Sequence, residues 1–172
     1  MTAKNQTPPQ NLSQVPLIRP IAADDADQLR KLYALSVGNN RDGFVQRPDF
    51  HGDIFERAQK YFSDNGEMLG LFAPDGTLLG FGGLKNKGDE RAELCNLHLH
   101  PERHGQGLGK RLAVTLMDDA EKLGYGILEL HVTVTQAAAI GLYQSLGFRE
   151  TKRQVYHVEG GTYDTVFMEI AL

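Results

Sequence analysis

The stretch that decides the fold is residues 92–125, AELCNLHLHPERHGQGLGKRLAVTLMDDAEKLGY. Residues 92–100 resemble a β-strand, and Pro101 ends it because proline has no N–H to donate to a neighbouring strand. From about Gly107, leucines recur at the spacing of an α-helix, and Gly124 is a typical residue to follow its end. The stretch therefore predicts a strand, a glycine-rich loop and a helix.

The loop between this strand and helix, residues 104–109, has the sequence HGQGLG. Its glycines allow tight turns and let a ligand approach the main chain closely. The first N–H groups of the following helix have no internal partner and carry partial positive charge, which suits a phosphate. Basic or potentially basic side chains gather here although the chain has a formal net charge of -4: they are Arg103, His104, Lys110 and Arg111. We expect a site for a phosphorylated ligand.

Three kinds of glycine loop could bind that phosphate. A P-loop is excluded, because Gly109-Lys110 is followed by Arg111 and the earlier glycine position holds His104. A dinucleotide fingerprint needs a different glycine spacing, and Glu129 lies inside its strand rather than at the strand's end. The third kind binds the pyrophosphate of coenzyme A.

Composition indicates an ordinary globular protein, with 172 residues, 41% hydrophobic and 23% charged. The acidic balance argues against a nucleic-acid partner, and the single cysteine, Cys95, leaves no internal disulfide. No apolar run reaches the roughly 20 residues that span a bilayer, and the N-terminus lacks the apolar core of a signal peptide. We expect a cytoplasmic protein without a membrane partner, in which residues 1–15 are a flexible tail and residues 16–172 a single domain.

The rest of the chain predicts a mixed sheet with helices packed on it. The expected order is β, α, α, β, β, β, α, β, α, β, β. Its helices cover about residues 24–37, 52–63, 107–123 and 136–146, and its strands about 16–21, 67–73, 78–85, 92–100, 127–135, 148–158 and 163–170.

Two motifs resemble a known family. The run Leu97-x-Leu99-x-Pro101, followed by His104-x-x-Gly107-x-Gly109, resembles the acyl-CoA signature of the GNAT superfamily of N-acetyltransferases, with His104 where the signature has Gln or Arg. Residues 136–148, QAAAIGLYQSLGF, resemble the family's C-terminal pattern, with Gln136 in place of Asn. The two motifs follow in the family's order, separated by one strand.

This resemblance, which covers roughly residues 17–172, implies an α+β fold of three α/β/α layers. The sheet would be mixed, mostly antiparallel and seven-stranded, with a V-shaped splay between its two central parallel strands and about four helices around it. Residues 16–172 would then be a single N-acetyltransferase domain.

The implied activity is transfer of an acetyl group from acetyl-CoA, as cosubstrate, directly to a primary amine of a small molecule in a ternary complex. Acetylation of a protein N-terminus or lysine, a non-catalytic CoA-binding module and a nucleotide-binding protein are the alternatives. The protein would act as a monomer or homodimer. Acceptor specificity is expected in the loop of residues 39–50 and the hairpin of residues 156–163.

The resemblance also implies which residues hold the cosubstrate. Backbone groups of Leu97 and Leu99 would hold the pantetheine arm, and a β-bulge near Asn96 and Leu97 commonly accompanies this arrangement. The whole implied set is Leu97, Leu99, His104, Gly105, Gln106, Gly107, Leu108, Gly109, Lys110, Gln136, Ala139 and Tyr143.

Two residues are the candidates for proton transfer. Tyr143 falls on the family's general-acid position, and a tyrosine pKa near 10 lies above the roughly 8.5 of a thiol, so it can donate to a leaving thiolate. Glu93 is the candidate base, in the register of histone-acetylating members. An ordered water chain anchored by Asn96, His98 or His131 is the alternative base.

A metal site is not expected. His98 and His100 form a His-x-His pair with His131 on the next strand, but no cluster of cysteine and histidine accompanies them.

Overall fold

The computed structural model describes residues 15–40, 52–158 and 161–172. The expected tail of residues 1–15 lies outside these ranges except for Val15. The acceptor loop of residues 39–50 is described only at its first two residues, and the tip of the last hairpin is likewise outside.

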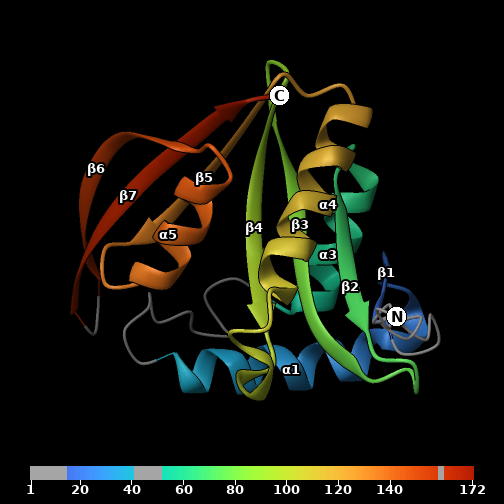
Figure 1. The fold of residues 1–172 in the computed structure, drawn as a ribbon. Coiled ribbons are helices and arrows are strands. Elements are labelled where there is room, and N and C mark those ends of the chain that lie inside the picture. Colours follow the sequence, from blue (N-terminus) through green and yellow to red (C-terminus); the bar gives the residue numbers. More distant parts are fainter. Residues whose placement is uncertain (1–14, 41–51, 159–160) are drawn as a thin grey trace, which may run out of the picture.

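One seven-stranded sheet forms the middle of the protein (Figure 1), with strand order β1-β2-β3-β4-β5-β7-β6. Its strands are β1 (Leu17–Pro20), β2 (Glu67–Phe72), β3 (Leu78–Gly88), β4 (Arg91–Leu99), β5 (Ile127–Thr133), β6 (Arg149–Val158) and β7 (Gly161–Ala171). Among the strands of the described residues, only β4 and β5 run parallel, and every other neighbouring pair is antiparallel. The mixed, mostly antiparallel sheet is confirmed.

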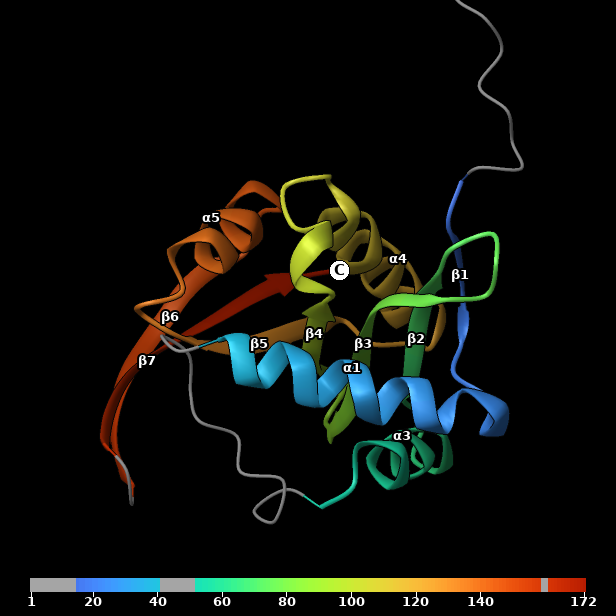
Figure 2. The same cartoon turned by 90° about the horizontal axis from the view of Figure 1, so that it is seen from below.

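Helices cover both faces of this sheet, as Figure 2 shows. The α-helices of the described residues are α1 (Ala26–Asn39), α3 (Ile54–Ser63), α4 (Leu108–Lys122) and α5 (Ala137–Ser145). Helices α1 and α3 pack on one face around a cluster with Leu29 and Phe81 at its centre. Helices α4 and α5 pack on the other face around Leu112, Leu116 and Leu128. The three-layer α+β fold is therefore confirmed.

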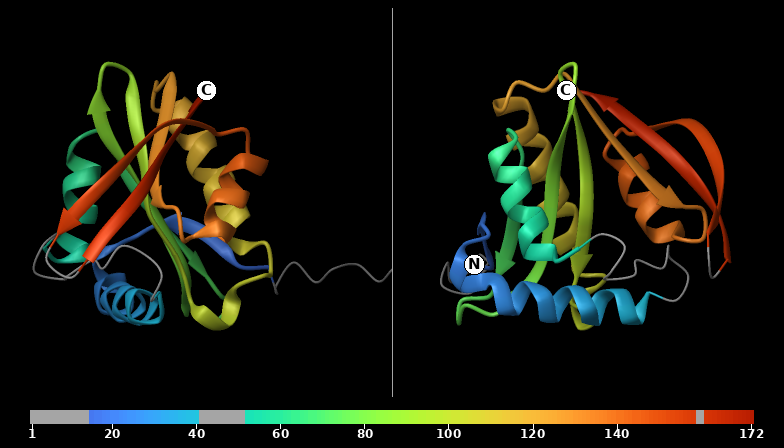
Figure 3. Two further views of the ribbon diagram at one scale, coloured as in Figure 1. Left: turned by 90° about the vertical axis from the view of Figure 1, so that its left-hand side faces the viewer. Right: turned by 180° about the vertical axis from the view of Figure 1, so that it is seen from behind.

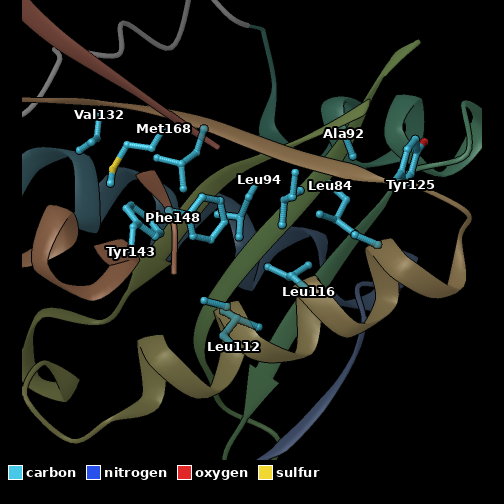
Figure 4. Close-up of a cluster of buried hydrophobic side chains, with 14 of the residues drawn as sticks. Leu84, Ala92, Leu94, Leu112, Leu116, Tyr125, Val132, Tyr143, Phe148 and Met168 are labelled. Carbon is cyan, nitrogen blue, oxygen red and sulfur yellow. The ribbon is translucent and has the colours of Figure 1, made fainter. Parts of the chain in front are cut away.

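The stretch of residues 92–125 folds as expected. It forms strand β4, a short 3-10 helix (Pro101–Arg103) and helix α4. Leu112 and Leu116 of the leucine stripe are fully buried against the sheet (Figure 4), while Gly124 follows the helix with φ of 91°. A positive φ there is inexpensive only for glycine, so Gly124 ends α4 and turns the chain toward β5.

The two parallel strands diverge. Strand β4 pairs with β5 only through Arg91–Ile127, Ala92–Leu128 and Glu93–Glu129. Beyond these pairs β5 stays bonded to β7 along its whole length, and β4 stays bonded to β3. The right-hand view of Figure 3 shows β4 and β5 meeting at one end of the sheet and separating toward the other. This divergence is the expected V-shaped splay.

A carboxyl group in the sheet has an altered pKa. Glu67, the first residue of β2, is half-buried beside Asp119 of α4. Burial, and then the neighbouring Asp119 carboxylate, raise the pKa of Glu67 from 4.5 to about 7. Because the folded protein binds this proton more tightly than the unfolded chain, Glu67 supports stability only while it is protonated.

We predict that replacing Glu67 by Gln raises the free energy of unfolding at about pH 8 and changes it little at about pH 5. The favourable contribution of Glu67 is complete below 4.5 and is lost as the pH rises through about 7. Urea unfolding of both proteins across this range measures the difference. Glu121→Gln, at an exposed position of α4, is the matched control. An identical pH dependence in all three proteins would contradict the prediction.

Candidate active site

Strand β4 carries a bulge where it leaves β5. Phe81 pairs with His98 and Gly83 with Cys95, so β4 has one residue more than β3 over this interval. Asn96 has a φ of 52°, in the left-handed region that asparagine tolerates better than most residues. The bulge expected near Asn96 and Leu97 is therefore present.

The bulge turns consecutive side chains of β4 toward the same face of the sheet. Cys95 Sγ and Asn96 Nδ2 lie 3.5 Å and 2.9 Å from the Tyr61 hydroxyl of α3. Leu97 returns to the opposite face and packs against the cluster under α4. At Leu97 the backbone of β4 thus runs along the opening between the parallel strands, where the sequence motifs predict a pantetheine arm.

The start of α4 presents unbonded amides. Its N-cap residue is Gly107, with φ of 76°, which has no side chain to accept a bond from the first turn. Gly105 also has a positive φ, of 72°. The first-turn N–H groups therefore carry the partial positive charge of the helix end, close to the exposed Lys110 and Arg111. This geometry suits an anion.

Gly109 brings the loop close to the open end of β4. A Cβ at this position would lie 3.3 Å from Leu99 Cδ1 and 3.9 Å from Leu142 Cδ2. The helix start, the end of β4 and helix α5 therefore meet here. Of the predicted cosubstrate residues, Leu99 and Gly109 are the two that this contact brings together, and Leu142 links them to the second motif.

Tyr143 of α5 lies in the hydrophobic cluster under α4 and α5. It is 7% exposed, and its ring meets the edge of Phe148 with centroids 5.8 Å apart (Figure 4). Burial, and then the Cys95 thiol, raise the pKa of Tyr143 above its ordinary value. The hydroxyl therefore keeps its proton at neutral pH.

In the second motif, the Gln136 side-chain amide donates to Thr133 Oγ1 at 3.2 Å, and Ala139 is half-buried against the same core.

Glu93 lies at the closed end of the splay, where β4 and β5 still pair. It is 8% exposed, and its two carboxylate oxygens lie 3.3 Å from Lys87 Nζ and from His131 Nδ1. Lysine and histidine thus hold the carboxylate from two sides.

The three histidines of the possible metal site lie apart. His98 Nδ1 lies 2.9 Å from Ser36 Oγ, under α1, whereas the His100 side chain accepts a bond from the Glu102 amide. His131 is on β5 beside Glu93. Within residues 15–40, 52–158 and 161–172, no three histidine, cysteine or acidic side chains form a group that could hold a metal ion.

Sequence reasoning missed one polar group at the bulge. Arg57 of α3 donates from Nη1 to Asn96 Oδ1 at 3.1 Å, and its guanidinium lies 5.0 Å from the centre of the Tyr33 ring. The available signal was a charge on an apolar helix face, because Arg57 falls at helical spacing between Ile54 and Tyr61, which are both buried.

None of the described helices has the length and apolar character needed to cross a membrane.

Curated relatives share part of the sequence. The chain is 39% identical over 85 residues to the ribosomal protein bS18-alanine N-acetyltransferase of Escherichia coli, an overlap of 48% of this chain and 57% of that protein. It is 30% identical over 139 residues to the mycothiol acetyltransferase of Clavibacter sepedonicus, covering 78% and 43% of the two chains. The chain thus spans about half the length of the curated relatives it matches.

Solved structures share the fold. A phosphinothricin acetyltransferase from Sinorhizobium meliloti, in complex with acetyl-CoA, superposes with a TM-score of 0.80 at 21% identity, covering 92% of this chain and 89% of that one. A putative acetyltransferase from Salmonella typhimurium with acetyl-CoA gives a TM-score of 0.73 at 23% identity, covering 91% and 93%.

A family model decides the relationship. The model of the acetyltransferase (GNAT) family matches residues 29–148, which include the bulged strand, the glycine loop and both motifs. The chain therefore belongs to the GNAT family of acetyltransferases.

Proposed function

We propose that the protein transfers an acetyl group from acetyl-CoA to a primary amine of a small molecule, in one step within a ternary complex. The observation that carries this proposal is the glycine-capped start of α4 beside the bulge of β4, at the opening between two parallel strands. The amides there fit a diphosphate, and the diverging strand edges fit an extended pantetheine arm.

In this proposal, acetyl-CoA supplies an acetyl thioester, and the chain supplies orientation and proton transfer. The amides at Leu108 to Lys110 hold the diphosphate, with His104 and Lys110 adding positive charge. The backbone at Leu97 and Leu99 aligns the pantetheine arm, and the bulge places a main-chain N–H where it can polarise the carbonyl.

Two side chains then handle protons. Tyr143, protonated at neutral pH, donates from Oη to the departing sulfur. Glu93 accepts the proton that the amine must lose, since an amine with a pKa near 10 arrives as an ammonium ion. A water chain anchored by Asn96 or His131 is the alternative acceptor.

Acetylation of a protein N-terminus is the second candidate, because the relative from Escherichia coli at 39% identity is named for an alanine of ribosomal protein bS18. Release of free thiol from acetyl-CoA, measured with a panel of small amines and with a peptide beginning in alanine, separates the two. Turnover of the peptide alone would replace the small-molecule proposal, and CoA binding without any turnover would indicate a binding module.

For the diphosphate contact, we expect Gly107→Asp to weaken CoA binding about tenfold relative to Gly107→Asn, measured by isothermal titration calorimetry. Both side chains tolerate a positive φ comparably and can cap the helix, but only aspartate adds a negative charge facing the phosphates. Equal affinity of the two variants would argue against an anion at the start of α4.

For the general acid, we expect Tyr143→Phe to lower kcat about 100-fold while the KM for acetyl-CoA stays near that of the wild type. Tyr125→Phe is the control, because Tyr125 is another buried tyrosine, whose hydroxyl donates to the Asn65 carbonyl beyond the end of α4. If the kcat of Tyr143→Phe equals that of the wild type, another group donates the proton.

For the base, we expect Glu93→Gln to lower kcat about 100-fold at neutral pH, with the loss shrinking as the pH approaches the pKa of the amine. Glu129→Gln, directly across the strand pair and bonded to Arg91, is the matched control. A normal rate in Glu93→Gln would favour the water chain.

A further inference from the structure

Arg57 lies at the bulge with most of its bonding capacity unused. Among the described residues, its guanidinium makes one hydrogen bond, from Nη1 to Asn96 Oδ1. Its Nε and Nη2 atoms are buried without a hydrogen-bond partner, and no acidic side chain of the described ranges forms an ion pair with it. Buried donors without acceptors are destabilising, and a buried unpaired charge more so. An anionic ligand would satisfy both nitrogens.

The two unused nitrogens match a particular ligand. Nε and Nη2 lie on the same edge of the planar guanidinium, and this edge forms two parallel hydrogen bonds to a carboxylate. The remaining nitrogen, Nη1, donates to Asn96, and the guanidinium Cζ lies 5.0 Å from the centre of the Tyr33 ring. The edge formed by Nε and Nη2, here called the fork, is therefore held in one orientation before a ligand binds.

The groups around this fork leave its charge uncompensated. Asn96 and Tyr61 are neutral, and burial, with a further contribution from Arg57, lowers the pKa of His98 to about 4. Cys95 is also neutral, because burial raises its pKa to about 12. These side chains lie on the face of the sheet that α3 and Arg57 cover. At neutral pH the described members of this group (Arg57, Tyr61, Cys95, Asn96 and His98) therefore carry one positive charge, that of Arg57.

Arg57 lies on the side of the sheet from which the acceptor amine is expected to approach. The diphosphate of the proposed function lies at the start of α4, on the α4–α5 face of the sheet. The amine must then reach the thioester from the remaining side, the α1–α3 face, where Asn96 of the bulge contacts Arg57. An anion bound by Arg57 would hold an attached amine next to the bulge.

We propose that Arg57 binds a carboxylate of the acceptor, so that the protein acetylates amines that also carry a carboxylate, as amino acids do. This inference rests on the proposed function and narrows its substrate class. Arg57 is in this role a specificity-determining residue, and it takes no part in moving protons.

Paired acceptors test the proposal. The probes are L-amino acids and the corresponding amino acid amides, which keep the amine and lose the carboxylate. We expect kcat/KM for acids to exceed that for amides about 10- to 100-fold in the wild type, and the ratio to fall to about one in Arg57→Gln, through the KM of the acid. Lys60→Gln, an exposed charge removal on the same helix, should keep the full ratio. Wild-type kinetics without a preference, or a preference that survives in Arg57→Gln, would overturn the proposal.

A binding measurement separates this proposal from the proposed function. N-acetylglycine or N-acetylglycinamide is titrated into ¹⁵N-labelled protein saturated with CoA, and the Arg57 Nε–H resonance, assigned by its loss in Arg57→Lys, is followed. A shift with the acid and none with the amide supports the carboxylate site even if no amine is acetylated. An unshifted resonance with both ligands overturns it, whatever the outcome for turnover. Failure of CoA to bind at all would instead count against the proposed function.

Discussion

The divergence of two parallel strands is the constraint on which the rest of the structure depends. Strands β4 and β5 share three residue pairs and then separate, while each keeps an antiparallel partner on its outer side. Their facing edges therefore carry backbone groups that no strand of the described ranges satisfies. An extended ligand can add to such edges as a strand does, because main-chain hydrogen bonds supply affinity without demanding a particular side chain. The bulge at Asn96 contributes by bending β4 at this point.

The two faces of the sheet differ in what they offer at this opening. On the α4–α5 face, a glycine-capped helix start supplies amides and partial positive charge for phosphates. On the α1–α3 face, Arg57, Asn96 and His98 form a polar group beneath two helices that otherwise bury apolar side chains. Each face has its own hydrophobic cluster, and the cluster under α4 and α5 joins residues of β4 with residues of β5 and β7 across the splay. Tyr143 of α5 is buried in the cluster on the first face.

Much of the fold was predictable, because its signals are local. The strand expected over residues 92–100 is β4, which begins and ends one residue earlier. The helix expected over residues 107–123 is α4, which is one residue shorter at each end. Alternation, leucine spacing and the Pro101 and Gly124 breaks act within a few residues, so neighbouring sequence is sufficient to read them. Arg57 was missed because its signal, a charge at helical spacing among apolar residues, is weak: it does not distinguish a side chain held by contacts with β4 from a solvated one.

By itself the sequence determined the order of elements, the glycine loop at the start of a helix, and the family motifs, since these depend on short-range backbone preferences. Only the tertiary structure decided which side chains meet. Arg57 reaches Asn96 across 39 positions of the chain, and Ser36 reaches His98 across 62. Such contacts depend on how distant segments pack and on the extra residue in β4, which reverses the alternation of its side chains. That reversal places Asn96 beside Arg57, and the spacing of residues along the chain does not encode it.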